Sequence, residues 1–159
     1  ALHQAEAVLQ VIGCGVFALW LWLVPLPPAA QVSALQQELA ALGSPWSQLW
    51  LALKVLGSVL AVPIAEELAF RGFLLRRLIA ADFTEVDKTR MTPLALAVSS
   101  LAFGALHPGA VAAGCLAGVA YALAQQLRGR TADAIVAHAV TNALIALDVL
   151  LGGAYWLWA

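Results

Sequence analysis

Residues 44–81 decide the fold class of this chain, and they run SPWSQLWLALKVLGSVLAVPIAEELAFRGFLLRRLIAA. Ser44-Pro45 is typical of a helix start, because serine caps the first turn and proline is tolerated in it. The apolar run that follows is too long for one straight membrane span, and Pro63 interrupts it. We therefore expect either one helix kinked at Pro63 or two helices that meet there.

The whole chain shares this apolar character. Of its 159 residues, 63% are hydrophobic and only 11% are charged, and the mean hydropathy is +0.89. These values lie outside the range of soluble domains. Six tryptophans suit the aromatic belts at membrane surfaces. We expect an integral membrane protein whose surroundings are the lipid bilayer, and a net charge of -1 gives no indication of a nucleic-acid partner.

Other apolar runs, bounded by proline, glycine and charge, predict the remaining helices. The predicted spans are 7–24, 92–107, 109–127 and 131–151. Residues 31–42 have the spacing of a short amphipathic helix at the interface. The predicted fold is therefore all-α: a polytopic transmembrane helix bundle of about five spans plus this interfacial helix. Residues 1–159 are expected to form a single membrane domain.

Two adjacent glutamates lie inside the long apolar run. Ionisable groups in membrane segments are expensive, and function is the usual reason to keep them. Glu67 and Arg71 are four residues apart with the acid first, the favourable order for an ion pair on a helix. Glu66 is rotated by about 100° to a different face. We expect Arg71 to pair with Glu67, which leaves Glu66 for another task.

Two further polar pairs follow on later helices. Phe103 and His107 are four residues apart, as are His138 and Asn142, so each pair lies on one helix face. Counting about 1.5 Å per residue from the helix ends places Glu66, His107 and Asn142 at a similar depth, with His138 shallower. These side chains are expected to share one site.

The order Glu-Glu-x-x-x-Arg, Phe-x-x-x-His and His-x-x-x-Asn on successive membrane helices resembles the CPBP family. This family contains the CAAX-processing and bacteriocin-processing intramembrane endopeptidases. All the diagnostic residues are present between Glu66 and Asn142. The expected catalytic core is 44–151.

The resemblance implies a role for each residue. Glu66 and His107 would activate the water that attacks a peptide carbonyl, and His138 and Asn142 would donate hydrogen bonds to the oxyanion. Glu67 with Arg71 would fix the helix and the electrostatics around Glu66. Phe103 is expected to pack beside His107. The implied substrate is a peptide or protein, membrane-attached in some members, and no cofactor is implied.

Two alternatives stay open. A carboxylate and two histidines could hold zinc, which would make the protein an intramembrane metalloprotease. The chain could also be a non-proteolytic scaffold subunit of a membrane complex that retains the residues of the three motifs.

The location and the partners of the chain are also predicted. Basic residues cluster around loops 82–90 and 128–130, on one side of the bilayer, which we expect to be the cytoplasmic side of a bacterial inner membrane. The sequence near Val62-Pro63 and over 128–142 resembles, more weakly, CAAX-protease-related proteins that are fused to exosortases. An exosortase fusion or partner is therefore also expected. The chain begins with Ala1 and not with Met, which is consistent with a fragment or a processed product.

Overall fold

The computed structural model describes residues 2–28 and 34–158, and in these ranges every regular element is helical. The elements before the charged loop are α1 (Leu2–Leu23), α3 (Ala34–Leu42), α4 (Trp46–Leu56), η1 (Gly57–Ala61), α5 (Val62–Glu67), η2 (Leu68–Leu74) and α6 (Leu75–Arg77). Those after it are η3 (Phe83–Glu85), α7 (Pro93–Ala105), α8 (Val111–Arg128), α9 (Thr131–Gly152) and η4 (Tyr155–Trp158). The all-helical fold class is confirmed.

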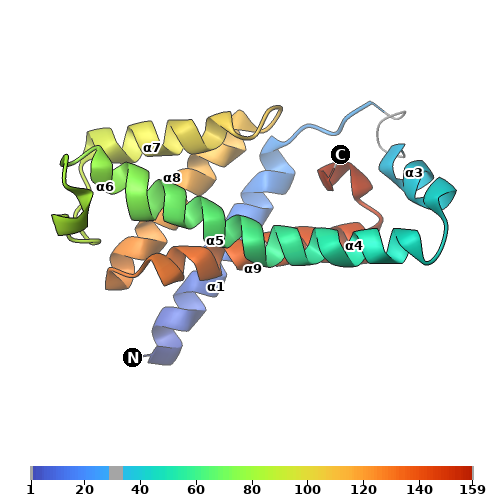
Figure 1. The fold of residues 1–159 in the computed structure, drawn as a ribbon, viewed down its shortest axis with the longest axis horizontal. Helices are drawn as coiled ribbons and strands as arrows, with labels where there is room; N and C mark the ends of the chain where they lie inside the picture. Colours follow the sequence, from blue (N-terminus) through green and yellow to red (C-terminus); the bar gives the residue numbers. More distant parts are fainter. Residues whose placement is uncertain (1, 29–33, 159) are drawn as a thin grey trace.

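The elements α4 to α6 form one uninterrupted helical run, Trp46–Arg77, which crosses the whole molecule in Figure 1. The chain therefore does not divide into two helices at Pro63. Pro63 has no N–H for the carbonyl four residues earlier, and the run responds by widening into the π-helical segment η1. The expected cap at Ser44 is wrong, because the helix starts at Trp46 after Pro45 without a side-chain cap.

The helix α7 begins as predicted. The hydroxyl oxygen of Thr92 accepts a hydrogen bond from the backbone N–H of Ala95, and Pro93 occupies the first turn. This helix ends at Ala105, so His107 lies in the turn beyond it and not on its face, which corrects the predicted boundary.

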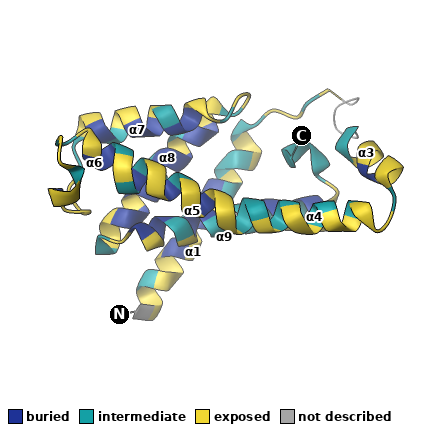
Figure 2. Cartoon of the chain, viewed as in Figure 1, coloured by how far each residue is buried: buried dark blue, intermediate teal, exposed yellow. Residues whose placement is uncertain are grey.

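Within residues 2–28 and 34–158, three helices are long and apolar enough to cross a membrane: His3–Leu23, Trp46–Arg77 and Thr131–Gly152. The apolar helix α7 is shorter, and α8 is not among the three, so length and composition support three of the about five predicted spans. Along α4 and η1 an exposed stripe of leucines recurs at helical spacing, as a lipid-facing surface requires. It consists of Leu49, Leu53, Leu56 and Leu60 (Figure 2).

The buried core lies where α1, α7, α8 and α9 cross (Figure 2). Small residues allow this close contact. A Cβ on Gly118 would come within 3.0 Å of Ser100 in α7, and one on Gly13 would come within 2.7 Å of Val140 in α9. The small residues at these positions therefore allow α8 to pack closely on α7, and α1 on α9.

The two basic clusters lie at the same end of the bundle, as predicted (Figure 1). The side-chain amides of Gln125 and Gln126 in α8 donate to the carbonyls of Lys88 and Thr89. Arg76 fixes the charged loop from the other side by donating to the carbonyls of Val86, Thr84 and Gly72.

Within this loop, Thr84 donates to Asp82 from its hydroxyl and its amide. The hydroxyl bond is the main reason that the pKa of Asp82 lies below its ordinary range. Thr89 does the same for the pKa of Asp87.

The predicted amphipathic segment 31–42 is helical from Ala34 to Leu42, and Leu39 is its buried residue. Positions 31–33, including Val32 of the predicted apolar face, lie outside the described residues. Its interfacial position stays a prediction.

Candidate active site

The ion pair between Glu67 and Arg71 is the most deeply buried charged feature of the site. Both side chains are fully buried. Arg71 Nη1 donates to Glu67 Oε1 at 3.1 Å, and Arg71 Nε lies 3.1 Å from Glu67 Oε2. Arg71 Nη2 also donates to the carbonyl of Gly118 at 2.8 Å, and its guanidinium lies 4.4 Å from the ring centre of Phe103. The predicted pairing is confirmed, and it also ties the long helix to α8.

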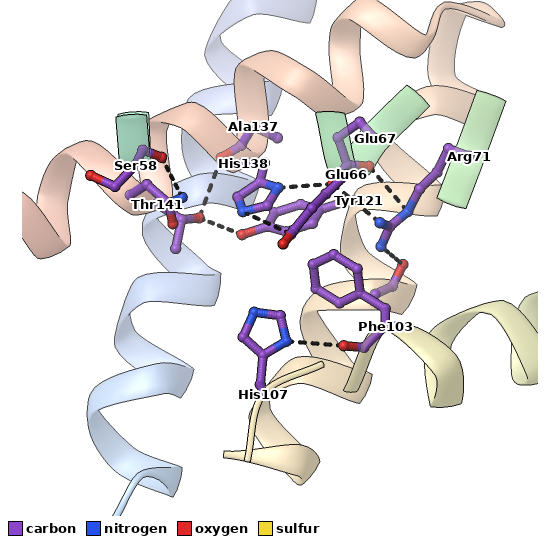
Figure 3. Close-up of polar contacts among 12 residues, drawn as sticks. Ser58, Glu66, Glu67, Arg71, Phe103, His107, Tyr121, Ala137, His138 and Thr141 are labelled. Atoms are coloured by element: carbon purple, nitrogen blue, oxygen red, sulfur yellow. Dashed lines mark hydrogen bonds and ion pairs between the residues drawn. The ribbon is translucent and has the colours of Figure 1, made fainter. Parts of the chain in front are cut away.

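His138 lies between the two glutamates (Figure 3). Its Nδ1 is 2.9 Å from Glu67 Oε1, and its Nε2 is 4.0 Å from Glu66 Oε2. A carboxylate can only accept a hydrogen bond, so Nδ1 donates. The two glutamates do point differently, but an imidazole has nitrogens on two sides, and one ring reaches both. Glu67 therefore contacts His138 directly, in addition to Arg71.

The two glutamates differ in their surroundings. The side chain of Glu67 is 0% exposed, whereas that of Glu66 is 22% exposed. The Oε2 atom of Glu66 is itself buried and has no hydrogen-bond partner among the described residues. An unsatisfied buried carboxylate oxygen is costly and needs an explanation. A water molecule bound between Glu66 and His138 would supply one.

The ring of His107 is oriented by the backbone carbonyl of Phe103, four residues earlier. Its Nδ1 lies 2.9 Å from the carbonyl oxygen of Phe103, which can only accept, so the hydrogen is on Nδ1 in the neutral ring. Nε2 is then left as an acceptor. The edge of Trp20 from α1 meets this ring at a centroid distance of 5.4 Å, and Phe103 packs at 5.0 Å. The ring is thus held by packing on two sides.

Asn142 completes the predicted set. Its Nδ2 donates to the carbonyl of Ser58 at 2.7 Å, which fixes the amide plane. An amide nitrogen carries two hydrogens, so one donor remains.

One cavity of ≈ 160 Å³ brings together side chains of the second and third motifs. Its lining includes Phe103, His107, His138 and Asn142, with Tyr121 and Thr141 beside them. In Figure 3, His107 faces Glu66 and His138 across an open space. Glu66 is not part of the lining but reaches His138 at its edge. At about 30 Å³ per water molecule, the cavity has room for several.

Sequence reasoning missed Tyr121. Its ring stacks on His138 at 4.6 Å with an interplanar angle of 13°, and its hydroxyl donates to Thr141 at 2.9 Å. Thr141 in turn donates to the carbonyl of Gly13 at 2.9 Å. A tyrosine in an apolar helix carries no signal that separates this role from ordinary packing.

A metal site was the basis of one alternative. In the ranges 2–28 and 34–158, no three His, Cys, Asp or Glu side chains gather so as to hold a metal ion. The zinc alternative therefore has no ligand set of this kind to support it.

The helical bundle and its polar cavity are those expected of an intramembrane hydrolase. Residues 48–144, more than half of the chain, match the family described as type II CAAX prenyl endopeptidase Rce1-like, and the chain belongs to this family. It is thus an integral membrane protein and a protease, and its family is not known to need a cofactor. Neither the curated proteins nor the solved structures compared with the chain gave a match.

Proposed function

We propose that this protein is an intramembrane endopeptidase in which Glu66, with His107, activates a water molecule to attack a peptide carbonyl. The observation that carries the proposal is the unpartnered Oε2 of Glu66, 4.0 Å from His138 Nε2, beside a cavity that His107 and His138 line. Glu66 accepts a proton from the water, and the acceptor Nε2 of His107 orients it from the other side.

His138 and Asn142 then stabilise the oxyanion. Asn142 has one amide hydrogen left after its bond to Ser58, and the backbone bond prevents the amide from turning away. His138 uses Nδ1 for Glu67, so a hydrogen bond from Nε2 to the oxyanion requires the ring to carry both protons. Preorganised donors of this kind are each worth about 3 kcal/mol in the transition state.

The substrate is a peptide or a membrane-attached protein. Loops 82–90 and 128–130 lie in the cytoplasm in this proposal, because the Lys and Arg residues of the chain cluster in and beside them at one end of the bundle. The bacterial inner membrane stays a prediction. The exosortase fusion or partner stays a prediction from sequence similarity.

Replacing Glu66 by Gln tests the proposal. The variant keeps the shape of the side chain but removes the base, so we expect the rate of peptide cleavage in proteoliposomes to fall by at least about 100-fold. Glu85→Gln, in the exposed loop, removes the same charge far from the cavity and should cleave at the wild-type rate. An unchanged thermal midpoint would show that both variants fold. Cleavage by Glu66→Gln at the wild-type rate would contradict the proposal, because Glu66 could not then be the required base.

A further inference from the structure

Lys54 lies at the junction of two cavities. The second cavity, of ≈ 740 Å³, adjoins the catalytic one, because both are lined by Trp20, Lys54, His107 and Leu157. Its remaining walls are the apolar segment 24–28, the turn 106–110 and Trp156. A peptide that enters this second cavity therefore passes Lys54 and His107 before it reaches His138 and Asn142.

The ammonium group of Lys54 has no anionic partner in the described part of the chain. Its one interaction is with the ring of Trp158, whose centre is 5.9 Å from Nζ. Neither cavity has an Asp or Glu among its described lining residues. Of the other cations in the long helix, Arg71 is paired with Glu67, and Arg76 and Arg77 lie at its end. An unpaired cation in an apolar helix is expensive, and such residues mark substrate paths.

The position of Lys54 relative to Asn142 determines how far from the scissile bond a substrate group bound by Lys54 would lie. Lys54 precedes Ser58 by about one helical turn, or about 6 Å, and the carbonyl of Ser58 binds the Asn142 amide. An extended peptide advances about 3.3 Å per residue. Allowing for the length of the lysine side chain, a group bound by Lys54 lies about two to four residues from the peptide bond at Asn142.

We propose that Lys54 binds a carboxylate of the substrate, two to four residues from the scissile bond, and so determines specificity. This inference rests on the proposed function, because it assumes that the cavity holds a peptide. The carboxylate can come from an acidic side chain or from the C-terminus of the substrate. The competing role for Lys54 is contact with lipid headgroups, since it lies about 12 Å along the helix from Trp46.

The test uses the full chain in proteoliposomes with synthetic lipid-anchored peptides, and mass spectrometry detects cleavage. A randomised set first identifies a peptide that the wild type cleaves. This peptide is then compared with versions that exchange each Glu or Asp for its amide, and with a version that has an amidated C-terminus. The proteins are the wild type, Lys54→Gln, Lys54→Glu and the control Lys88→Gln, which changes the other lysine of the chain, in an exposed loop.

We expect one carboxylate of the peptide, compared with its amide, to lower KM by about tenfold for the wild type and for Lys88→Gln. The same comparison should show no such difference for Lys54→Gln. Lys54→Glu should instead prefer a lysine at that position of the peptide. The exchange that removes the effect shows whether the carboxylate is a side chain or the terminus. A carboxylate preference that persists in Lys54→Gln would overturn the inference, as would selectivity that is unchanged in both Lys54 variants.

Binding separates this inference from the proposed function. If the wild type cleaves no peptide, the proposed function fails, and fluorescent forms of the same anchored peptides still report on Lys54. Weaker binding of acidic peptides to Lys54→Gln than to Lys88→Gln would support the carboxylate site. Equal binding would overturn it.

Discussion

Each polar residue of the site has a neighbour that fixes its direction. Glu67 holds His138, the carbonyl of Phe103 holds His107, and the carbonyl of Ser58 holds Asn142. Glu66 is the exception, because its buried Oε2 has no hydrogen bond among the described residues and lies 4.0 Å from His138 Nε2. Glu67 Oε2 also lacks a hydrogen bond there, but it lies 3.1 Å from the cation Arg71. A catalytic group that must exchange protons with water is expected to differ from its supports in this way.

Arg71 carries a stability prediction. Arg71→Met would leave Glu67 as a buried carboxylate without its cation, and removing one member of a buried pair costs about 3–5 kcal/mol. Thermal or denaturant unfolding in detergent measures this loss. The control is Arg77→Met, at an exposed position six residues along, for which we expect a change of no more than about 0.5 kcal/mol. Equal stabilities for the two variants would show that the pair does not act as a structural anchor.

The helix α1 lies outside the residues that match the family, yet it touches the site twice. Trp20 packs against His107, and the carbonyl of Gly13 accepts the hydrogen bond of Thr141, one turn from His138. The contact between α1 and α9 therefore helps to position His107 and His138, two of the proposed catalytic residues.

Two neighbouring glycines of α1 test this contact. A Cβ on Gly13 would lie 2.7 Å from the carbonyl oxygen of Ala137, whereas one on Gly15 would have nothing within 4 Å. We expect Gly13→Ala to destabilise the protein by about 1–3 kcal/mol and to slow cleavage, because α1 must move away from α9. Gly15→Ala makes the same chemical change on an open face and should leave both quantities at or above their wild-type values. If the two variants behave alike, α1 is not packed on α9 in this way.

The sequence predicted some elements better than others, for physical reasons. The Thr92 start and the Glu67–Arg71 pair depend on residues within one turn, so spacing alone suffices. The π-helical segments around Pro63 depend on how the long helix accommodates a missing hydrogen bond, and the pattern of apolar residues is silent on this. The helix α7 ends two residues earlier than predicted, because Leu106 continues the apolar pattern past Ala105 and does not mark the end of the helix.

At the scale of the whole molecule, the two loops at one end predict the orientation in the membrane. Lys88 lies at the same end as the turn after α8, and Ala112 lies at the other end of that helix. A cysteine at Lys88 should react with a membrane-impermeant maleimide only in inverted vesicles, and a cysteine at Ala112 only in intact cells. Cys14→Ser and Cys115→Ser remove the native thiols beforehand. The opposite labelling pattern would show that the basic loops are not cytoplasmic.

The arrangement of the candidate site was only partly predictable from the sequence. The three motifs identified Glu66, His107, His138 and Asn142, and the cavity collects three of these with Glu66 at its edge. Tyr121, Trp20 and Lys54 lie around the same space, but as single residues in apolar helices they form no spacing pattern. Their positions follow from how the helices cross, which is a property of the whole bundle.

The central claim is that Glu66 and His107 act on one water molecule, and a double-mutant cycle in kcat/KM tests it most directly. Residues that act as a unit give losses that do not add. We predict that the double variant Glu66→Gln, His107→Ala retains the same residual cleavage as the more impaired single variant. Losses that multiply, with each single variant still active, would mean that the two residues act independently and would contradict the claim.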